Sequence, residues 1–84
     1  MDKVALLAGI KEALRPYTKN QEALENISES TDFIKDLKIN SANLVDVVLD
    51  VEEKFNIVID NESMEKMINV QTAMDIVANK LAAS

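Results

Sequence analysis

The sequence predicts an all-α domain: a four-helix bundle with a long first loop and a short third helix. Two observations predict this fold class. Apolar residues recur at spacings of three and four in separate segments, which is the period of a helix that buries one face. The chain also has one Gly and one Pro among its 84 residues, too few for the closely spaced turns of an all-β fold. We expect a single domain over residues 1–84.

The first helix is expected over residues 3–16, where one apolar face repeats at helical spacing. That face consists of Leu6, Leu7, Ile10, Ala13, Leu14 and Tyr17. Pro16 lacks a backbone N–H and disfavours helical geometry at Arg15, so the helix should end or kink there. Residues 18–36 are polar and irregular, and we expect a long loop pinned by scattered apolar side chains, with room for a helical turn within 21–27.

The second helix has the clearest pattern. Asn40 and Ser41 are both favourable residues for its N-cap. The apolar stripe that follows has the width of a core-facing helix face. It consists of Leu44, Val47, Val48, Val51 and Phe55. An extended connection over 56–59 should then bury Ile57 and Ile59, because a lone strand would have no partner.

Two further helices are expected in the last third of the chain. Asp60 or Asn61 should cap a short third helix that ends near Met67, and Asn69 should cap the fourth. The apolar face of the fourth helix consists of Val70, Ala73, Met74, Val77 and Leu81. Four helices, one of them short, would then surround one core.

The composition excludes several classes of function. Lys and Arg total 9 against 15 Asp and Glu, a formal charge of −6, which disfavours nucleic acid and anionic membrane partners and favours basic protein surfaces. The chain has no Cys and no His, so we expect no metal site and no catalytic residue. No apolar run approaches the length of a membrane span. We therefore expect a cytoplasmic monomer.

An ordered set of motifs runs from Phe33 to Val77. The motifs are Phe33-Ile34-Lys35-Asp36-Leu37, Asn40-Ser41-Ala42, Val51-Glu52-Glu53-Lys54-Phe55, Ile57-Val58-Ile59-Asp60, Glu65-Lys66-Met67 and Val70-Gln71-Thr72-Ala73. In this order they resemble the acyl carrier protein family, whose pattern has an aromatic residue, Asp-Leu-Gly-x-Asp-Ser-Leu, and a helix ending in Glu-Glu-x-Phe. The resemblance covers more than half of the chain.

The resemblance implies a covalent cofactor on Ser41. In the family the serine at this position receives 4'-phosphopantetheine from coenzyme A through a separate transferase, and the thiol of the arm holds acyl or polyketide groups as thioesters. A chain with no thiol or imidazole of its own would need such an imported sulfur. Free amides and the dipole at a helix N-terminus would also favour the phosphate. The alternative interpretation of Ser41 is a plain N-cap.

Three departures from the family pattern surround Ser41. Asn40 replaces the usual Asp, Ala42 the usual Leu, and Lys38 the glycine of the loop. Asn keeps the capping ability of Asp but loses its charge. These departures imply that modification of Ser41 is slower or needs a dedicated transferase. They also imply a specialised carrier for a polyketide or lipid. An unmodified helical adaptor with the carrier fold is the first alternative function, and an enzyme, disfavoured by the missing His and Cys, is the second.

A second apolar row lies on the second helix, displaced from the core stripe. Ala42, Val45 and Leu49 form this row beside Ser41, and we interpret it as a docking surface ringed by acids that meet basic residues of acyl-processing enzymes. The expected docking residues are Asn40, Ala42, Val45, Asp46, Leu49, Asp50 and Glu53. The alternative is a wider buried face that packs against the long loop.

A third group of residues matches, by position, the lining of the acyl cavity in the family. These residues are Phe33, Ile34, Val51, Met64, Met67 and Ala73. Methionine is flexible and suits a pocket that opens for a chain. Ordinary core packing is the alternative role for each of them.

Overall fold

The computed structural model describes residues 2–83, and within them it contains five α-helices, one 3₁₀ helix and no strands. The elements are α1 (Lys3–Leu14), α2 (Gln21–Glu25), η1 (Ser41–Asn43), α3 (Leu44–Phe55), α4 (Asn61–Glu65) and α5 (Val70–Ala83). The prediction of an all-α fold is confirmed. The count of four helices omitted α2, which forms a single turn in the segment expected to be a loop with room for such a turn.

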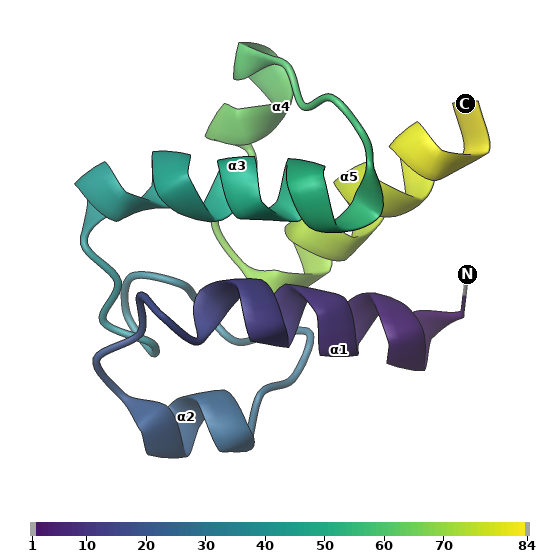
Figure 1. Ribbon diagram of the computed structural model, residues 1–84. Coiled ribbons are helices and arrows are strands. Elements are labelled where there is room, and N and C mark those ends of the chain that lie inside the picture. The colour runs from purple at the N-terminus through teal and green to yellow at the C-terminus, as the bar shows by residue number, and fades with distance from the viewer. Residues whose placement is uncertain (1, 84) are drawn as a thin grey trace.

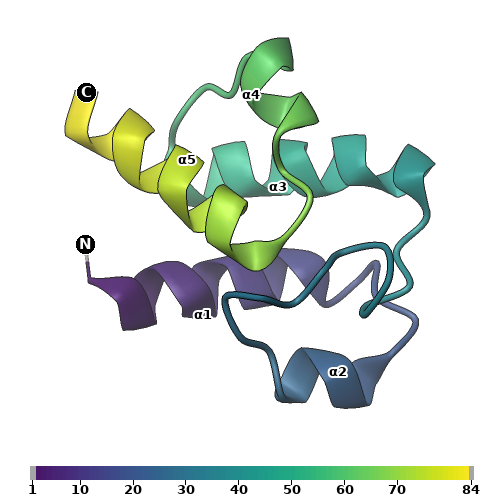
Figure 2. The same ribbon diagram turned by 180° about the vertical axis from the view of Figure 1, so that it is seen from behind.

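Three helices form the body of the molecule. In Figure 1, α1 and α3 run antiparallel to each other, and α5 crosses behind them. Figure 2 shows the molecule from behind, with α5 on the near side. In this view α4 lies above α3, and α2 lies below α1. Helix α1 contacts both α3 and α5. The buried side chains of all three meet in one core, together with apolar residues of α2 and the long loop.

Helix α1 begins where the sequence indicates and ends close to the expected stop at Pro16. The carboxylate of Asp2 accepts a hydrogen bond from the Ala5 amide at 2.8 Å, a regular N-cap. The helix ends at Leu14, with Arg15 as its C-cap immediately before Pro16, two residues earlier than expected. Gly9 lies where α1 approaches α3, because a Cβ at this position would overlap the tip of the Phe55 ring.

The start of α3 differs from the expectation. Asn40 is the N-cap, and the first turn after it is the 3₁₀ helix η1, so the α-helix itself begins at Leu44. Along α3 the stripe is buried at Val47, Val48, Val51 and Phe55 and partly buried at Leu44. The helix ends at Phe55, and its C-cap Asn56 has a left-handed backbone with φ 55°, a conformation that Asn tolerates better than most residues.

The connection after α3 is held by a side chain of that helix. A carboxylate oxygen of Glu52 accepts a hydrogen bond from the Ile59 amide at 2.6 Å. Ile59 is buried, whereas Ile57 is only partly buried. Asp60 then caps α4 by accepting from the Ser63 amide at 2.8 Å. The expected capping residue is therefore Asp60, and α4 ends at Glu65, before Met67.

The long loop is tied to the start of α5 by its backbone. The Phe33 amide donates to the Ile68 carbonyl at 3.2 Å, and the Val70 amide donates to the Thr31 carbonyl at 3.0 Å. Asn69 caps α5 as expected, since its side-chain oxygen accepts from the Thr72 amide at 2.9 Å. The apolar side chains that anchor the loop region are buried: Leu24, Phe33, Leu37 and Ile39. This anchoring fixes where the chain enters η1.

Candidate functional site

Ser41 is exposed at the first position of η1. Its neighbour Asn40 performs the capping: the Asn40 side chain accepts from the Ala42 amide at 2.9 Å, and the Asn40 carbonyl accepts from the Asn43 amide at 2.8 Å. Within residues 2–83 the Ser41 hydroxyl makes no hydrogen bond. The interpretation of Ser41 as a plain N-cap is therefore wrong, and its hydroxyl is free for chemistry.

The amides at the start of η1 are less available to an anion than the sequence indicated. Those of Ala42 and Asn43 are bonded to Asn40, and the amide of Leu44 donates to the Ser41 carbonyl. The expectation of free amides beside Ser41 is thus wrong for these three groups. The alignment of peptide dipoles remains as a general attraction for negative charge.

The loop before Ser41 contains an unusual backbone conformation. Lys38 has φ 58°, in the left-handed region, which costs a residue with a Cβ about 1–2 kcal/mol. The turn that precedes it is held by two acids: the Asp32 carboxylate accepts from the Ile34 and Lys35 amides at 2.9 and 2.8 Å, and the Asp36 carboxylate accepts from the Asp32 amide at 2.7 Å. Lys38 itself is exposed.

The second apolar row of α3 is uncovered. Val45 is 48% exposed and Leu49 55% exposed, and Ala42 is also exposed. The alternative that this row packs against the long loop is therefore wrong. Of the acids predicted to surround the row, Asp46 and Glu53 are exposed.

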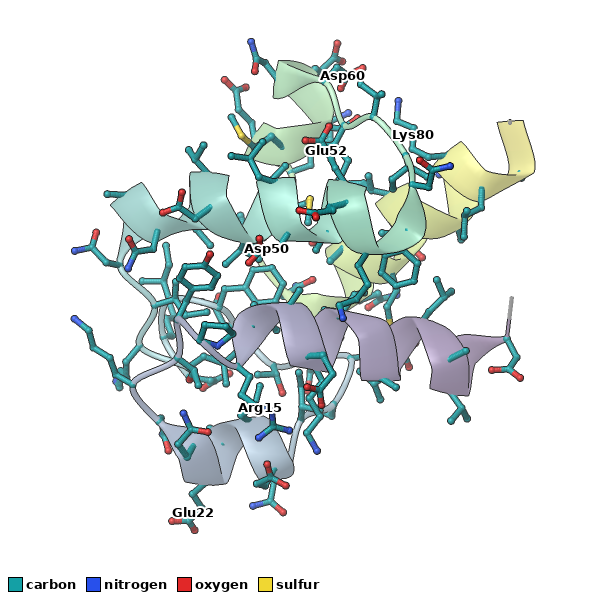
Figure 3. All side chains as sticks on the ribbon, viewed as in Figure 1. Arg15, Glu22, Asp50, Glu52, Asp60 and Lys80 are labelled. Carbon is teal, nitrogen blue, oxygen red and sulfur yellow. The ribbon has the colours of Figure 1, made fainter. Side chains whose placement is uncertain are left out.

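The third acid of this group, Asp50, is partly buried and has an internal partner. The Tyr17 hydroxyl donates to the Asp50 carboxylate at 2.9 Å, and this bond is the main reason why the pKa of Tyr17 is raised above its usual value. Figure 3 shows Asp50 on the side of α3 that faces α1, and Glu52 on the side of the α3–α4 connection. Sequence reasoning missed Tyr17 as a partner of Asp50, because the two residues lie 33 positions apart.

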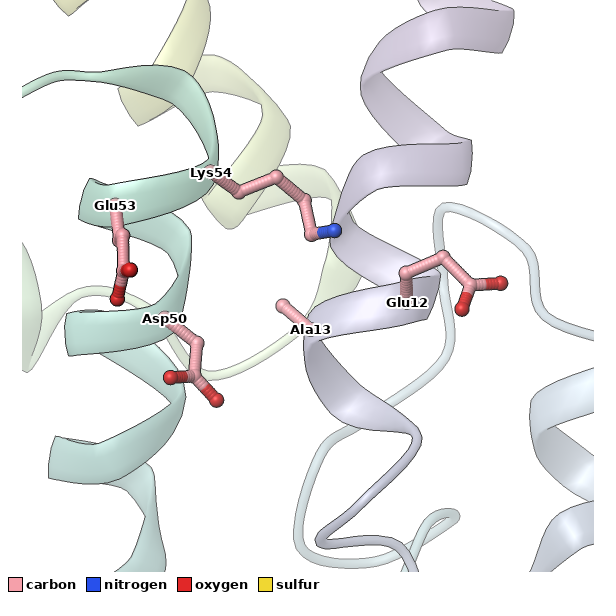
Figure 4. Close-up of a pocket in the computed structure, with 5 residues that line it drawn as sticks. All are labelled: Glu12, Ala13, Asp50, Glu53 and Lys54. Carbon is pink, nitrogen blue, oxygen red and sulfur yellow. The ribbon is translucent and has the colours of Figure 1, made fainter.

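A pocket of about 310 Å³ opens between α1 and α3 next to this bond. It is lined by Glu12, Ala13, Asp50, Glu53 and Lys54. Figure 4 shows the Lys54 side chain extending from α3 toward α1, with Asp50 on the same side of α3 and Glu53 pointing along the helix. The charged lining of this pocket suits polar contacts at the edge of a protein interface and does not suit an alkyl chain. Within the described residues, no group of three or more acidic side chains is arranged to hold a metal ion.

Most residues of the expected acyl cavity lie together in the core. Phe33, Val51, Met67 and Ala73 are buried, and Met64 is partly buried. Ile34 is 45% exposed and lies outside this group, because the turn held by Asp32 points the next residue after Phe33 outward. In the part of the chain that the structure describes, no helix has both the length and the apolar character to cross a membrane.

Comparison with known proteins places the chain in a family. No family model matches it. The acyl carrier protein of Helicobacter pylori (strain J99) is 39% identical over 57 residues, which span 67% of this chain and 73% of the relative. The chain belongs to the acyl carrier protein family. The acyl carrier protein of Buchnera aphidicola subsp. Schizaphis graminum is 35% identical over 57 residues, covering 68% and 72%, and that of Nitratidesulfovibrio vulgaris (strain DP4) is 32% identical over 56 residues, covering 67% and 74%.

Two of the residues around Ser41 that differ from the acyl carrier protein pattern can now be described from the structure. Asn40 retains the cap that an Asp would form, as its bond to the Ala42 amide shows. Lys38, where the family pattern quoted above has a glycine, has a left-handed backbone, which glycine adopts more freely than lysine. The backbone at position 38 is therefore one that glycine would adopt freely, while the side chain there is a lysine.

Proposed function

We propose that this member of the acyl carrier protein family carries acyl groups as thioesters on a 4'-phosphopantetheine arm attached to Ser41, and that it has no catalytic activity of its own. The observation that carries the proposal is the exposed Ser41 hydroxyl, which takes part in no hydrogen bond within the described residues and is not needed as a cap. A role in fatty-acid, polyketide or specialised lipid synthesis in the cytoplasm is the setting that we infer.

The residues at this position fit the arm. In the transfer, the Ser41 oxygen would bond to the phosphorus of the pantetheine phosphate, the bond from that phosphorus to the nucleotide part of coenzyme A would break, and the serine proton would pass to the transferase. When bound, the arm supplies the thiol that this chain lacks, since the sequence has no Cys. The chain contributes an accessible oxygen on a rigid turn, where Asn40 holds the backbone.

The uncovered row on α3 supports a docking role. Val45 and Leu49 offer apolar contact, and Asp46 and Glu53 offer exposed charges at its edge. Charges of this kind mainly steer the encounter with a basic surface, while the apolar contacts contribute affinity. Asn40, Ala42 and Asp50 complete the proposed surface, which would receive the transferase and the acyl-processing enzymes.

The buried group beneath α3 is the proposed place for the acyl chain. Phe33, Val51, Met67 and Ala73 are apolar and come from the long loop, α3 and the α4–α5 region. Met64 borders them and is flexible enough to yield space. Because α4 is a five-residue helix at the edge of the bundle, its displacement would open this group with little loss of packing elsewhere.

Intact mass spectrometry tests the proposal. The protein is incubated with coenzyme A and each of several phosphopantetheinyl transferases, including the one from its own source. We expect the addition of one phosphopantetheine mass to the parent protein and to the control variant Ser30→Ala, whose serine is exposed in the long loop. The variant Ser41→Ala should remain unmodified.

Failure of every transferase to modify the parent protein would contradict the carrier role. It would favour the alternative of an unmodified helical adaptor, for which the uncharged Asn40 before the serine is the specific observation. Modification that persists in Ser41→Ala would contradict the assigned site alone.

A further inference from the structure

The side chain of Lys38 has no internal role that explains a lysine at this backbone position. It is exposed, and within residues 2–83 its ammonium takes part in no hydrogen bond or ion pair. The left-handed conformation at φ 58° is one that Gly or Asn would occupy at lower cost. Residues held in such sparsely populated backbone regions are concentrated at functional sites.

The other left-handed residue of the chain provides a contrast. Asn56 has φ 55°, belongs to a residue type that tolerates this region, and closes α3 by donating its amide to the Glu52 carbonyl. Its conformation is explained within the fold. At Lys38 the buried neighbours Leu37 and Ile39 fix the conformation, but the fold does not explain why a lysine stands there, so we look for the explanation of the residue type in what binds to the molecule.

The ammonium of Lys38 forms no ion pair with the acids of its own loop within residues 2–83. The carboxylates of Asp32 and Asp36 both accept backbone amides of the turn. Lys35 is exposed as well, and Asn40 adds no negative charge. In the part of the chain that the structure describes, the loop side of Ser41 therefore presents two unpaired ammonium groups beside two carboxylates that are bonded to the backbone, whereas α3 on the other side of Ser41 has Asp46 and Glu53 exposed.

Lys38 is close enough to Ser41 to meet any protein that reaches the hydroxyl. Three residues of extended chain span at most about 10–11 Å, so a transferase whose active site encloses Ser41 must also cover Lys38. Enzymes that act on the far end of a flexible arm need not approach as closely. The transferase is thus the partner whose surface Lys38 would contact.

We propose that Lys38 is a specificity-determining residue for the modification of Ser41, and that it selects a transferase with an acidic side chain opposite it. This inference rests on the proposed carrier function. A partner with basic groups facing α3 and an acid facing Lys38 would match both charges at once. A transferase with a basic group at that place would be repelled, which is how like charges exclude wrong partners.

The kinetics of phosphopantetheine transfer from coenzyme A test this inference. Lys38→Gln removes the charge and keeps a long side chain, Lys38→Arg keeps the charge, and Lys38→Glu reverses it. Lys35→Gln is the matched control, because Lys35 is also an exposed lysine of this loop but has no left-handed backbone. With the transferase from the same source we expect KM to rise about tenfold in Lys38→Gln and further in Lys38→Glu, a change of the size that a close interfacial charge pair produces.

Several readouts separate recognition from structure. The KM of Lys38→Arg should lie within about twofold of the parent's KM. The kcat should change little in all four variants. The KM difference between the parent and Lys38→Gln should shrink at higher salt, because salt screens the charge pair. Equal KM values for the parent and Lys38→Gln with every transferase that modifies the parent would overturn the inference and leave the carrier function intact. A parent protein that no transferase modifies would overturn both.

Discussion

At the scale of single residues, the loop before Ser41 has an exposed lysine, Lys38, in a backbone conformation that suits glycine better. Lys38 holds the same left-handed region as Asn56, with φ 58° against 55°. The buried neighbours Leu37 and Ile39, both at most 1% exposed, anchor the chain on either side. Residue 38 must therefore follow the turn whatever its side chain prefers, because leaving the turn would expose two core residues.

Lys38→Gly should stabilise the protein. Glycine adopts a positive φ without a Cβ penalty, so we expect the free energy of unfolding to rise by about 1 kcal/mol. Urea denaturation of the parent and the variant measures this difference. The control Lys35→Gly, at an ordinary backbone position, should lose stability through the greater freedom of its unfolded chain. If Lys38→Gly is no more stable than the parent, the backbone at position 38 is not strained.

At the scale of elements, the contact between α1 and α3 depends on one missing side chain. Gly9 leaves room for the ring of Phe55, which is 9% exposed at the end of α3. A glycine inside a helix sacrifices about 1 kcal/mol of helix propensity relative to alanine. The close approach of the two helices explains why this position accepts that cost.

Gly9→Ala should destabilise the protein despite the better helix former. A Cβ would overlap the Phe55 ring, and overpacking of this kind costs about 1–3 kcal/mol, so we expect a net loss of about 1 kcal/mol. The same substitution in a Phe55→Leu background should instead be neutral or stabilising, because the overlapping atoms are gone. Chemical denaturation of the four proteins gives the double-mutant cycle. Equal effects of Gly9→Ala in both backgrounds would refute the contact.

A second link at this scale joins the end of α1 to α3. The Tyr17 hydroxyl donates to Asp50, and the bond raises the pKa of Tyr17, with smaller contributions from burial and from the charges of Asp50 and Asp46. A raised pKa in the folded state means that the bond stabilises the fold fully below the unfolded value of about 10. This stabilisation is lost as the pH rises through the higher folded pKa.

The ionisation of Tyr17 should be readable directly. The chain has one Tyr and no Trp, so ultraviolet absorption of tyrosinate reports this residue alone. We expect a titration midpoint above 10 in the parent and a midpoint nearer the ordinary value in Asp50→Asn, which keeps an acceptor but loses the charge. Asp46→Asn should shift the midpoint less. A midpoint that is unchanged in Asp50→Asn would show that the two side chains are not bonded in solution.

At the scale of the whole molecule, the formal charge of −6 is unevenly distributed around the site. The exposed acids Asp46 and Glu53 lie on α3, and the exposed bases Lys35 and Lys38 lie in the loop before Ser41 together with the exposed acid Asp36. A uniformly acidic carrier would attract a basic partner without orienting it. The two signs on either side of Ser41 can steer and orient the partner together.

Leu49→Ala should weaken docking without weakening the fold. Leu49 is 55% exposed, and truncation of a surface residue usually changes stability by less than about 0.5 kcal/mol, whereas loss of a central apolar contact should raise the KM of a partner enzyme about tenfold. Transfer kinetics and thermal unfolding measure the two effects. Val58→Ala, at a valine that is 78% exposed on the α3–α4 connection, is the control. Equal KM values for the two variants would exclude Leu49 from the docking surface.

The sequence by itself determined most of the helices, because their signals are local. The stop at Pro16, the caps Asp60 and Asn69, and the core stripe of α3 depend on neighbours within one or two turns. The tertiary structure decided which faces are covered. Periodicity marks two apolar rows on α3, but only the packing of α1, α5 and the loop leaves Val45 uncovered. The bond between Tyr17 and Asp50 likewise joins residues whose separation along the chain hides their contact, since folding alone brings them together.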